Sequence, residues 1–114
     1  MSDPDVDGPG AADLPPGPTP AVVEWVEKLT IYLESQDRGE SLWCPQWPDH
    51  PEAVWRFTAL YEEFVISLQE GTMSGWWVNH FDRHAPALFG PTGIFQSCEN
   101  GHDPERRFRF ARRA

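Results

Sequence analysis

The stretch Met73-Ser74-Gly75-Trp76-Trp77-Val78-Asn79-His80-Phe81-Asp82-Arg83-His84 decides the fold, because it places large aromatic side chains beside two histidines and an aspartate. On a helix, Trp76, His80 and His84 follow one another at four-residue intervals and share one face. The other aromatic residues of the stretch form a neighbouring apolar ridge. The stretch therefore predicts a helix that carries a histidine pair at the edge of an aromatic core.

Two further stretches carry apolar residues at three- and four-residue intervals, which is the pattern of a helix with one face in a core. In the first, Thr19 suits the N-cap and Pro20 the first helical position, so we predict a helix over residues 20–35. In the second, Pro51 opens a helix over residues 51–69, where the apolar spacing is the most regular in the chain.

The helix that contains the opening stretch is expected over residues 74–85. Gly71 can end the preceding helix, Ser74 can cap the new one, and Pro86 ends or kinks it. Residues 88–95 then read as a hairpin or an irregular loop around a Gly-Pro turn. The fold class predicted is mostly α: a small three-helix domain with a short irregular or hairpin segment.

Composition divides the chain into three parts. Residues 1–18 are rich in Asp, Pro and Gly and have almost no large apolar side chain, so we expect a disordered acidic arm. Residues 19–102 form one small domain, whose core depends on the six tryptophans and seven phenylalanines of the chain. Residues 103–114 form a basic tail.

The formal net charge of −9 argues against nucleic acid as the main partner, because phosphate binding needs a basic surface. An acidic body can instead bind a protein. The sequence shows no signal peptide and no apolar run long enough for a membrane span, so we expect a cytoplasmic protein with no membrane contact. In such a reducing compartment, two cysteines favour burial or metal binding over a disulfide.

A zinc site is one interpretation of the cysteines and histidines. Cys98 and His102 have a C-x3-H spacing, and Cys44 lies in a proline-bounded loop that can present a thiolate. His50, His80 and His84 can each supply a fourth ligand, and we favour one of the last two. The alternative is a pair of buried reduced cysteines with histidines that serve only packing.

A catalytic interpretation uses some of the same side chains. Cys98 can act as a nucleophile, with His102 or His80 as the base and Asp82 to orient it. Alternatively, His80, Asp82 and His84 can form an open metal site for hydrolysis. The chain is short, and no phosphate-binding glycine loop is present. We therefore expect a non-enzymatic interaction protein, with a metal-dependent or thiol hydrolase as the alternative.

The basic tail offers a separate binding surface, in which arginines alternate with aromatic residues. Its arginines are Arg106, Arg107, Arg109, Arg112 and Arg113. They can contact phosphates weakly while the rings stack on bases, which makes the chain a weak nucleic-acid binder as a further alternative. We favour a frayed tail, or one that docks on the acidic body near Glu62, Glu63 or Glu70.

Four motifs occur in a fixed order along the chain. They are W-C-P-Q-W from Trp43, H-P-E-A from His50, M-S-x-W-W-x-x-H-x-D-x-H from Met73, and G-P-x-G-x-F-x-x-C from Gly90. Together they resemble the actinobacterial family known as domain of unknown function 4913. The resemblance covers residues 21–102.

The resemblance implies a small protein of actinobacteria, their phages or their mobile plasmids, with no established activity to carry over. It implies a cytoplasmic accessory factor that acts through a host or phage protein. The characteristic positions of the family would be Trp43, Cys44, His50, Glu52, Trp77, His80, Asp82, His84, Phe95 and Cys98. This sequence departs at Pro48, where the family pattern has an aromatic residue.

Overall fold

The computed structural model describes residues 17–36, 41–98 and 101–102. Within these residues the chain forms three long helical segments, two short 3-10 helices and no strand. The segments are α1 (Pro20–Ser35), α2 (Pro51–Glu70), and a continuous run of α3 (Met73–Gly75), the π-helix η4 (Trp76–Phe81) and α4 (Asp82–Phe89). The prediction of a mostly α, three-helix domain is confirmed, with bounds that differ from the predicted ones by only a few residues.

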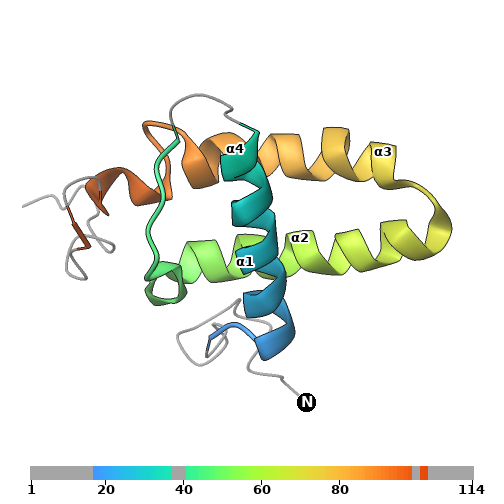
Figure 1. The fold of residues 1–114 in the computed structure, drawn as a ribbon, viewed down its shortest axis with the longest axis horizontal. Helices are drawn as coiled ribbons and strands as arrows, with labels where there is room; N and C mark the ends of the chain where they lie inside the picture. The colour runs from blue at the N-terminus through green and yellow to red at the C-terminus, as the bar shows by residue number, and fades with distance from the viewer. Residues whose placement is uncertain (1–16, 37–40, 99–100, 103–114) are drawn as a thin grey trace, which may run out of the picture.

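The second and third segments form an antiparallel helical hairpin (Figure 1). Gly71 makes its closed end: this residue has a φ of 73°, and its N–H donates to the carbonyl of Ser67. Glycine adopts that left-handed conformation without the strain a side chain would add. The opposite, open end of the hairpin holds the start of α2 and the segment that follows α4 (Figure 1).

Helix α1 crosses the hairpin at a steep angle and covers both of its helical segments (Figure 1). Its N-terminus has the predicted cap, because the hydroxyl of Thr19 accepts a hydrogen bond from the Val22 N–H at 3.3 Å. The side chain of Trp25 lies where the three segments meet. Its ring centroid is 5.4 Å from that of Phe64 and 5.9 Å from that of Trp76. One tryptophan therefore joins α1 to both arms of the hairpin.

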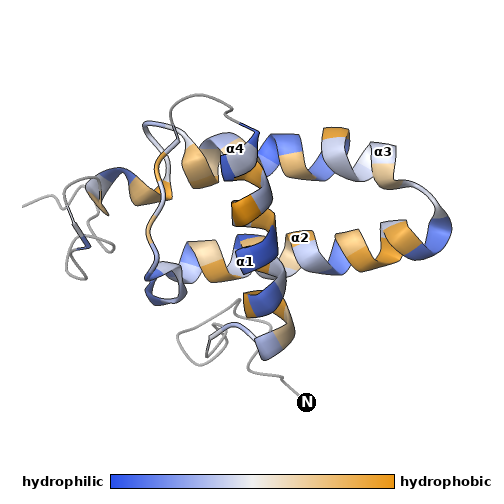
Figure 2. Ribbon diagram, viewed as in Figure 1, coloured by the Kyte–Doolittle hydropathy of each residue, from blue (hydrophilic) through white to orange (hydrophobic). Residues whose placement is uncertain are grey.

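Hydrophobic and hydrophilic residues alternate along each helix (Figure 2), as the periodicity predicts. The core is mostly aromatic and aliphatic, and its most deeply buried large side chains include Trp76, Phe57, Phe81 and Phe95. The indole N–H of Trp76 donates to the carbonyl of Leu60 at 2.9 Å across the hairpin. This bond satisfies the polar atom of a side chain that is only 1% exposed.

The π-helix changes which residues share a face. Here the Asp82 N–H donates to the carbonyl of Trp77, five residues earlier, so each turn holds one more residue than an α-helix. Trp76 and Phe81 therefore lie almost above one another, and their rings stack at 5.7 Å. The surroundings of Trp76 and His80 differ despite their four-residue spacing: Trp76 is buried, whereas 40% of the His80 side chain is exposed.

Two details at the ends of the third segment also differ from expectation. The segment begins at Met73, with Thr72 rather than Ser74 at the N-cap position and no capping bond from the Thr72 side chain. Pro86 does not end the helix, which continues to Phe89. The Gly90 N–H then donates to the Pro86 carbonyl at 2.9 Å and closes the last turn.

The segments that flank the hairpin are irregular. A one-turn helix, η3 (Trp47–Asp49), precedes α2, and a short 3-10 helix, η5 (Ile94–Cys98), follows α4. Residues 88–95 therefore form no hairpin: residues 88–89 belong to α4, residues 90–93 form a turn, and residues 94–95 begin η5. The N-terminal arm up to residue 16 and the basic tail from residue 103 lie outside the described residues. Within the described part, no helix is long and apolar enough to cross a membrane.

Candidate metal centre

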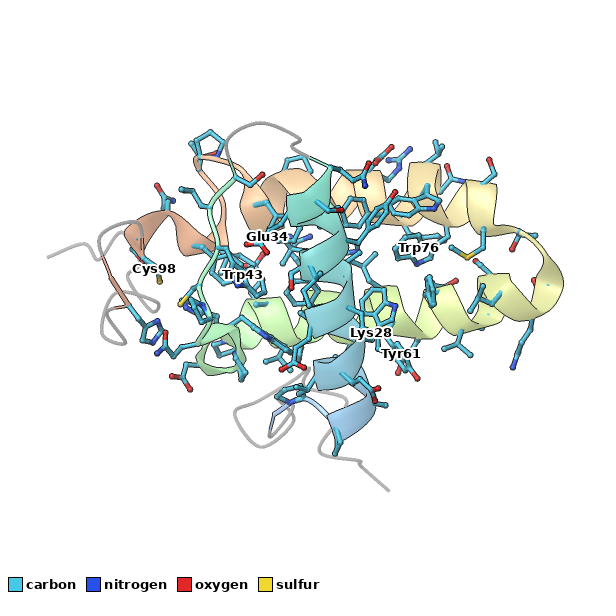
Figure 3. All side chains as sticks on the ribbon, in the orientation of Figure 1. Lys28, Glu34, Trp43, Tyr61, Trp76 and Cys98 are labelled. Carbon is cyan, nitrogen blue, oxygen red and sulfur yellow. The ribbon has the colours of Figure 1, made fainter. Side chains whose placement is uncertain are left out.

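Two cysteines and two histidines meet at the open end of the hairpin. They are Cys44, His50, Cys98 and His102, and their ligand atoms all lie within 4.8 Å of one another. Cys44, His50 and Cys98 are buried, and only 13% of the His102 side chain is exposed. Figure 3 shows Cys98 at this end, beyond the loop that carries Trp43 and far from Trp76. These four side chains are close enough to hold one metal ion.

The loop before α2 brings the first ligand into place. The Leu42 N–H donates to the carbonyl of Phe89 at 2.9 Å, which ties this loop to the end of α4. Next along the chain, Trp43 packs its ring edge-on against Phe95, with centroids 5.4 Å apart. Cys44 follows directly and is 1% exposed. Contacts to two other parts of the chain, the end of α4 and η5, therefore set the position of this thiol.

The turn η3 and the start of α2 supply the second ligand. The Trp47 ring is buried and lies 5.1 Å from that of Phe57. The His50 N–H donates to the Trp47 carbonyl at 2.9 Å, and His50 is the residue that precedes the first turn of α2. The His50 imidazole packs edge-on against Phe95 at 5.1 Å. Both the turn and the core therefore orient this histidine.

The remaining ligands follow α4 through a turn that admits glycine only. A Cβ at Gly90 would lie 2.5 Å from the carbonyl oxygen of Pro86, and one at Gly93 would lie 2.4 Å from that of Ala87. Because both neighbours are backbone atoms, neither can move aside easily. The two glycines let η5 fold back against the end of α4, and η5 ends at the ligand Cys98.

The distances between ligand atoms suit a tetrahedral ion. The Cys98 Sγ lies 3.5 Å from His50 Nε2 and 3.6 Å from His102 Nδ1, and the Cys44 Sγ lies 3.0 Å from His102 Nδ1. Zinc bonds of about 2.3 Å to sulfur and about 2.0 Å to nitrogen give a sulfur–nitrogen edge of about 3.5 Å. Two of the three distances match this edge, and the third needs to open by roughly half an ångström.

The surroundings of the Cys44 thiol favour its protonated form. Burial, followed by the hydrogen bond to Cys98, raises the pKa of the Cys44 thiol to about 11, against the opposing effect of a hydrogen bond with the backbone of Gln46. Protein groups alone therefore keep this thiol protonated at neutral pH. A divalent cation reverses that preference, because thiolate ligands deprotonate on binding and their negative charge is offset.

The histidines of the opening stretch lie elsewhere. His80 Nε2 is 3.8 Å from a carboxylate oxygen of Glu63, and His84 Nδ1 is 2.9 Å from the Arg56 guanidinium, which donates to it. Burial, then Arg56 and His80, hold the pKa of His84 below its ordinary value of 6.5. Neither histidine belongs to the four-residue cluster.

The cluster thus contains three of the ligands favoured from the sequence, Cys44, Cys98 and His102, and takes His50 as the fourth. Asp82 is exposed at the start of α4. Cys98 has His50 and His102 as its neighbours.

The sequence signal that could have identified His50 as the fourth ligand is its position: it lies six residues after Cys44, at the same end of α2. The five tail arginines, from Arg106 to Arg113, lie outside the described residues.

Comparison with known proteins gives one match. The sequence profile of the family described as "Domain of unknown function (DUF4913)" matches residues 20–112, most of the chain. The chain therefore belongs to this family, which confirms the family resemblance seen in its motifs. No curated protein and no solved structure matches significantly.

Proposed function

We propose that this chain is a non-enzymatic interaction protein whose helical hairpin is held at its open end by a structural zinc ion. The observation that carries the proposal is the convergence of two thiols and two imidazoles within 4.8 Å. Their four ligand atoms come from the loop before α2, the start of α2, the end of η5 and the residue pair 101–102. A set of two cysteines and two histidines is a common donor set of structural zinc.

The closed ligand set favours a structural role over a catalytic one. Catalytic zinc keeps three protein ligands and an open position for water or substrate, whereas four protein ligands fill a tetrahedral ion. Three of the four residues are buried, which leaves little access for a substrate. A small domain with a short hairpin also gains stability from an ion that joins distant segments.

The outer face of α2 supports a protein partner. Trp55 and Ile66 are 45% and 43% exposed, and they are separated by about three helical turns, so they lie on one face. Ala59 and Glu62 are exposed between them. An exposed tryptophan in line with an apolar residue is typical of a protein contact, since aromatic side chains supply much of the affinity at such surfaces. The acidic net charge of −9 favours a partner with a basic surface.

The family resemblance adds a biological setting to this proposal. Its implied occurrence in actinobacteria, their phages and their mobile plasmids favours an accessory factor that acts in the cytoplasm on a host or phage protein. Weak nucleic-acid binding through the arginine tail stays an alternative, and salt dependence separates the two. Binding through at most five cations falls steeply between low and physiological salt, whereas an apolar protein contact changes little.

The zinc proposal is tested by metal analysis of the full chain, purified without added metal or chelator. We expect about one zinc per chain, and a strong loss of thermal stability when a chelator removes it. Cys44→Ser and Cys98→Ser should both lower the zinc content and make melting insensitive to chelator. Ser97→Ala, next to one ligand, is the matched control and should keep the ion. Less than about 0.2 zinc per wild-type chain, with unchanged melting in chelator, contradicts the proposal.

The interaction proposal needs a separate test. Trp55→Ser and Ile66→Ser should release a partner that copurifies from the host with the wild-type chain, and should leave zinc content and melting unchanged. Val78→Ser alters a residue that is 58% exposed on the third helical segment and serves as the control surface. A partner that is retained by both α2 variants would exclude this face.

A further inference from the structure

We infer that Asp49 is a positioning residue of the metal centre: its carboxylate holds the His102 imidazole so that Nδ1 faces the two cysteines. This inference rests on the proposed zinc site and deepens it. It assigns a role to a residue that is not itself a ligand, and it predicts that substitution of Asp49 lowers the zinc affinity of the site.

The two nitrogens of His102 face different surroundings. Nδ1 lies 3.0 Å from the Cys44 Sγ and 3.6 Å from the Cys98 Sγ, whereas Nε2 lies 3.5 Å from the Asp49 Oδ2. A histidine that binds a metal through Nδ1 keeps its proton on Nε2. That N–H then needs an acceptor, and a carboxylate is a common one at zinc histidines.

Among the described residues, His102 Nε2 lacks a hydrogen-bond acceptor, and the Asp49 carboxylate lies close to it. Nε2 of His102 is buried and makes no hydrogen bond to any described residue. The Asp49 carboxylate is just beyond hydrogen-bonding distance, and 56% of its side chain is exposed. An exposed carboxylate can rotate by the few tenths of an ångström that the bond requires.

The backbone of Asp49 is fixed well enough to do this. Its N–H donates to the carbonyl of Gln46 at 2.9 Å, and the buried Trp47 anchors the same turn in the core. The next residue, His50, is itself a ligand of the proposed site. The turn η3 therefore places two groups at the site. One is the ligand His50, which follows the turn directly, and the other is Asp49, the acceptor for the distant ligand His102.

Charge supports the same role. Two thiolates already attract a divalent cation, and the Asp49 carboxylate adds a third negative charge beside them. Replacement by asparagine removes the charge and keeps an acceptor oxygen, whereas replacement by alanine removes both. The two substitutions therefore separate orientation from charge.

The test measures zinc affinity of the full chain by competition with a chromophoric chelator. Asp49→Ala should weaken zinc binding by about 10- to 100-fold, the usual effect of losing a carboxylate behind a metal-bound histidine. Asp49→Asn should weaken it less, because an acceptor remains. Asp82→Ala removes a similarly exposed carboxylate from α4 and should leave the affinity unchanged.

A second readout distinguishes positioning from a general effect on folding. Melting of the chelated protein should be the same for Asp49→Ala and the wild type. In the zinc-loaded wild type, nitrogen NMR should show His102 coordinated through Nδ1 with a slowly exchanging Nε2 proton, and this proton should exchange fast in Asp49→Ala. A wild type that binds zinc, with an affinity that Asp49→Ala leaves unchanged, overturns the inference alone. A wild type that binds no zinc overturns the proposed function and this inference together.

Discussion

The two ends of the helical hairpin are held together by different means. At the closed end, the chain itself joins α2 to α3, and one glycine in a left-handed conformation completes the turn. At the open end, segments far apart in sequence meet through a short loop, a buried aromatic set and four metal-ligand side chains. The closed end needs only a favourable backbone conformation. The open end needs several side chains and, as proposed, an ion.

This difference predicts that the open end tolerates less change. A peptide bond cannot dissociate, so the closed end keeps its helices near each other even when the turn is strained. Contacts between Cys44 and Cys98 close a loop of more than 50 residues, and the entropy lost on closure must be recovered from the contacts themselves. Equal substitutions at the two ends should therefore have unequal effects.

The largest effect is expected for Gly93→Ala at the open end. The new Cβ would lie 2.4 Å from the Ala87 carbonyl oxygen and 2.9 Å from its carbon, and these backbone atoms belong to α4. Relief of this clash must move the turn that leads to Cys98. We expect a loss of about 3 kcal/mol in the free energy of unfolding, the upper part of the range for overpacking. The same variant should bind zinc more weakly, which competition with a chelator measures.

The matched substitution at the closed end is Gly71→Ala, and its effect should be smaller. A Cβ here would meet no atom within 4 Å, so the cost comes only from the φ of 73°. Left-handed backbone costs a residue with a side chain about 1 kcal/mol. Denaturant unfolding should show this loss, with zinc affinity unchanged. A loss as large as that of Gly93→Ala would remove the proposed difference between the two ends.

The sequence predicts the helices and the Gly71 turn better than it predicts the open end. The periodicity of α2, the capping residues Thr19 and Pro20, and the helix-ending Gly71 act over a few neighbouring residues, so a local pattern reveals them. The predicted helices over 20–35 and 51–69 are observed almost unchanged.

The π-helix escaped prediction because its extra residue per turn leaves no strong local signal. The four-residue spacing of His80 and His84 places both on one face of a helix, and the sequence favours one of them as the fourth ligand. In the structure, the hairpin carries His84 to Arg56 instead. The choice of His50 depends on which segments meet at the open end, and that is a property of the tertiary fold rather than of spacing.

The smallest effect concerns the contact between the two arms at Arg56 and His84. Because the pKa of His84 is lowered in the folded state from 6.5, the unfolded chain binds more protons just below that pH. The contribution of His84 to stability is therefore complete above pH 6.5 and is lost as the pH falls through the folded-state pKa. A protonated His84 cannot accept the Arg56 bond, and it faces the neighbouring charge of His80 as well.

His84→Gln isolates this effect, since glutamine offers Arg56 an acceptor oxygen and does not titrate. Protonation of the zinc ligands His50 and His102 also destabilises the protein at low pH, but it does so equally in the variant and the wild type. The difference in unfolding free energy between the two proteins, measured from pH 7.5 to 5, should therefore change in favour of the variant as the pH falls. A constant difference, or one that favours the wild type at pH 5, would show that the Arg56–His84 contact does not depend on a neutral imidazole. Zinc content measured at each pH separates this small effect from loss of the ion at the open end.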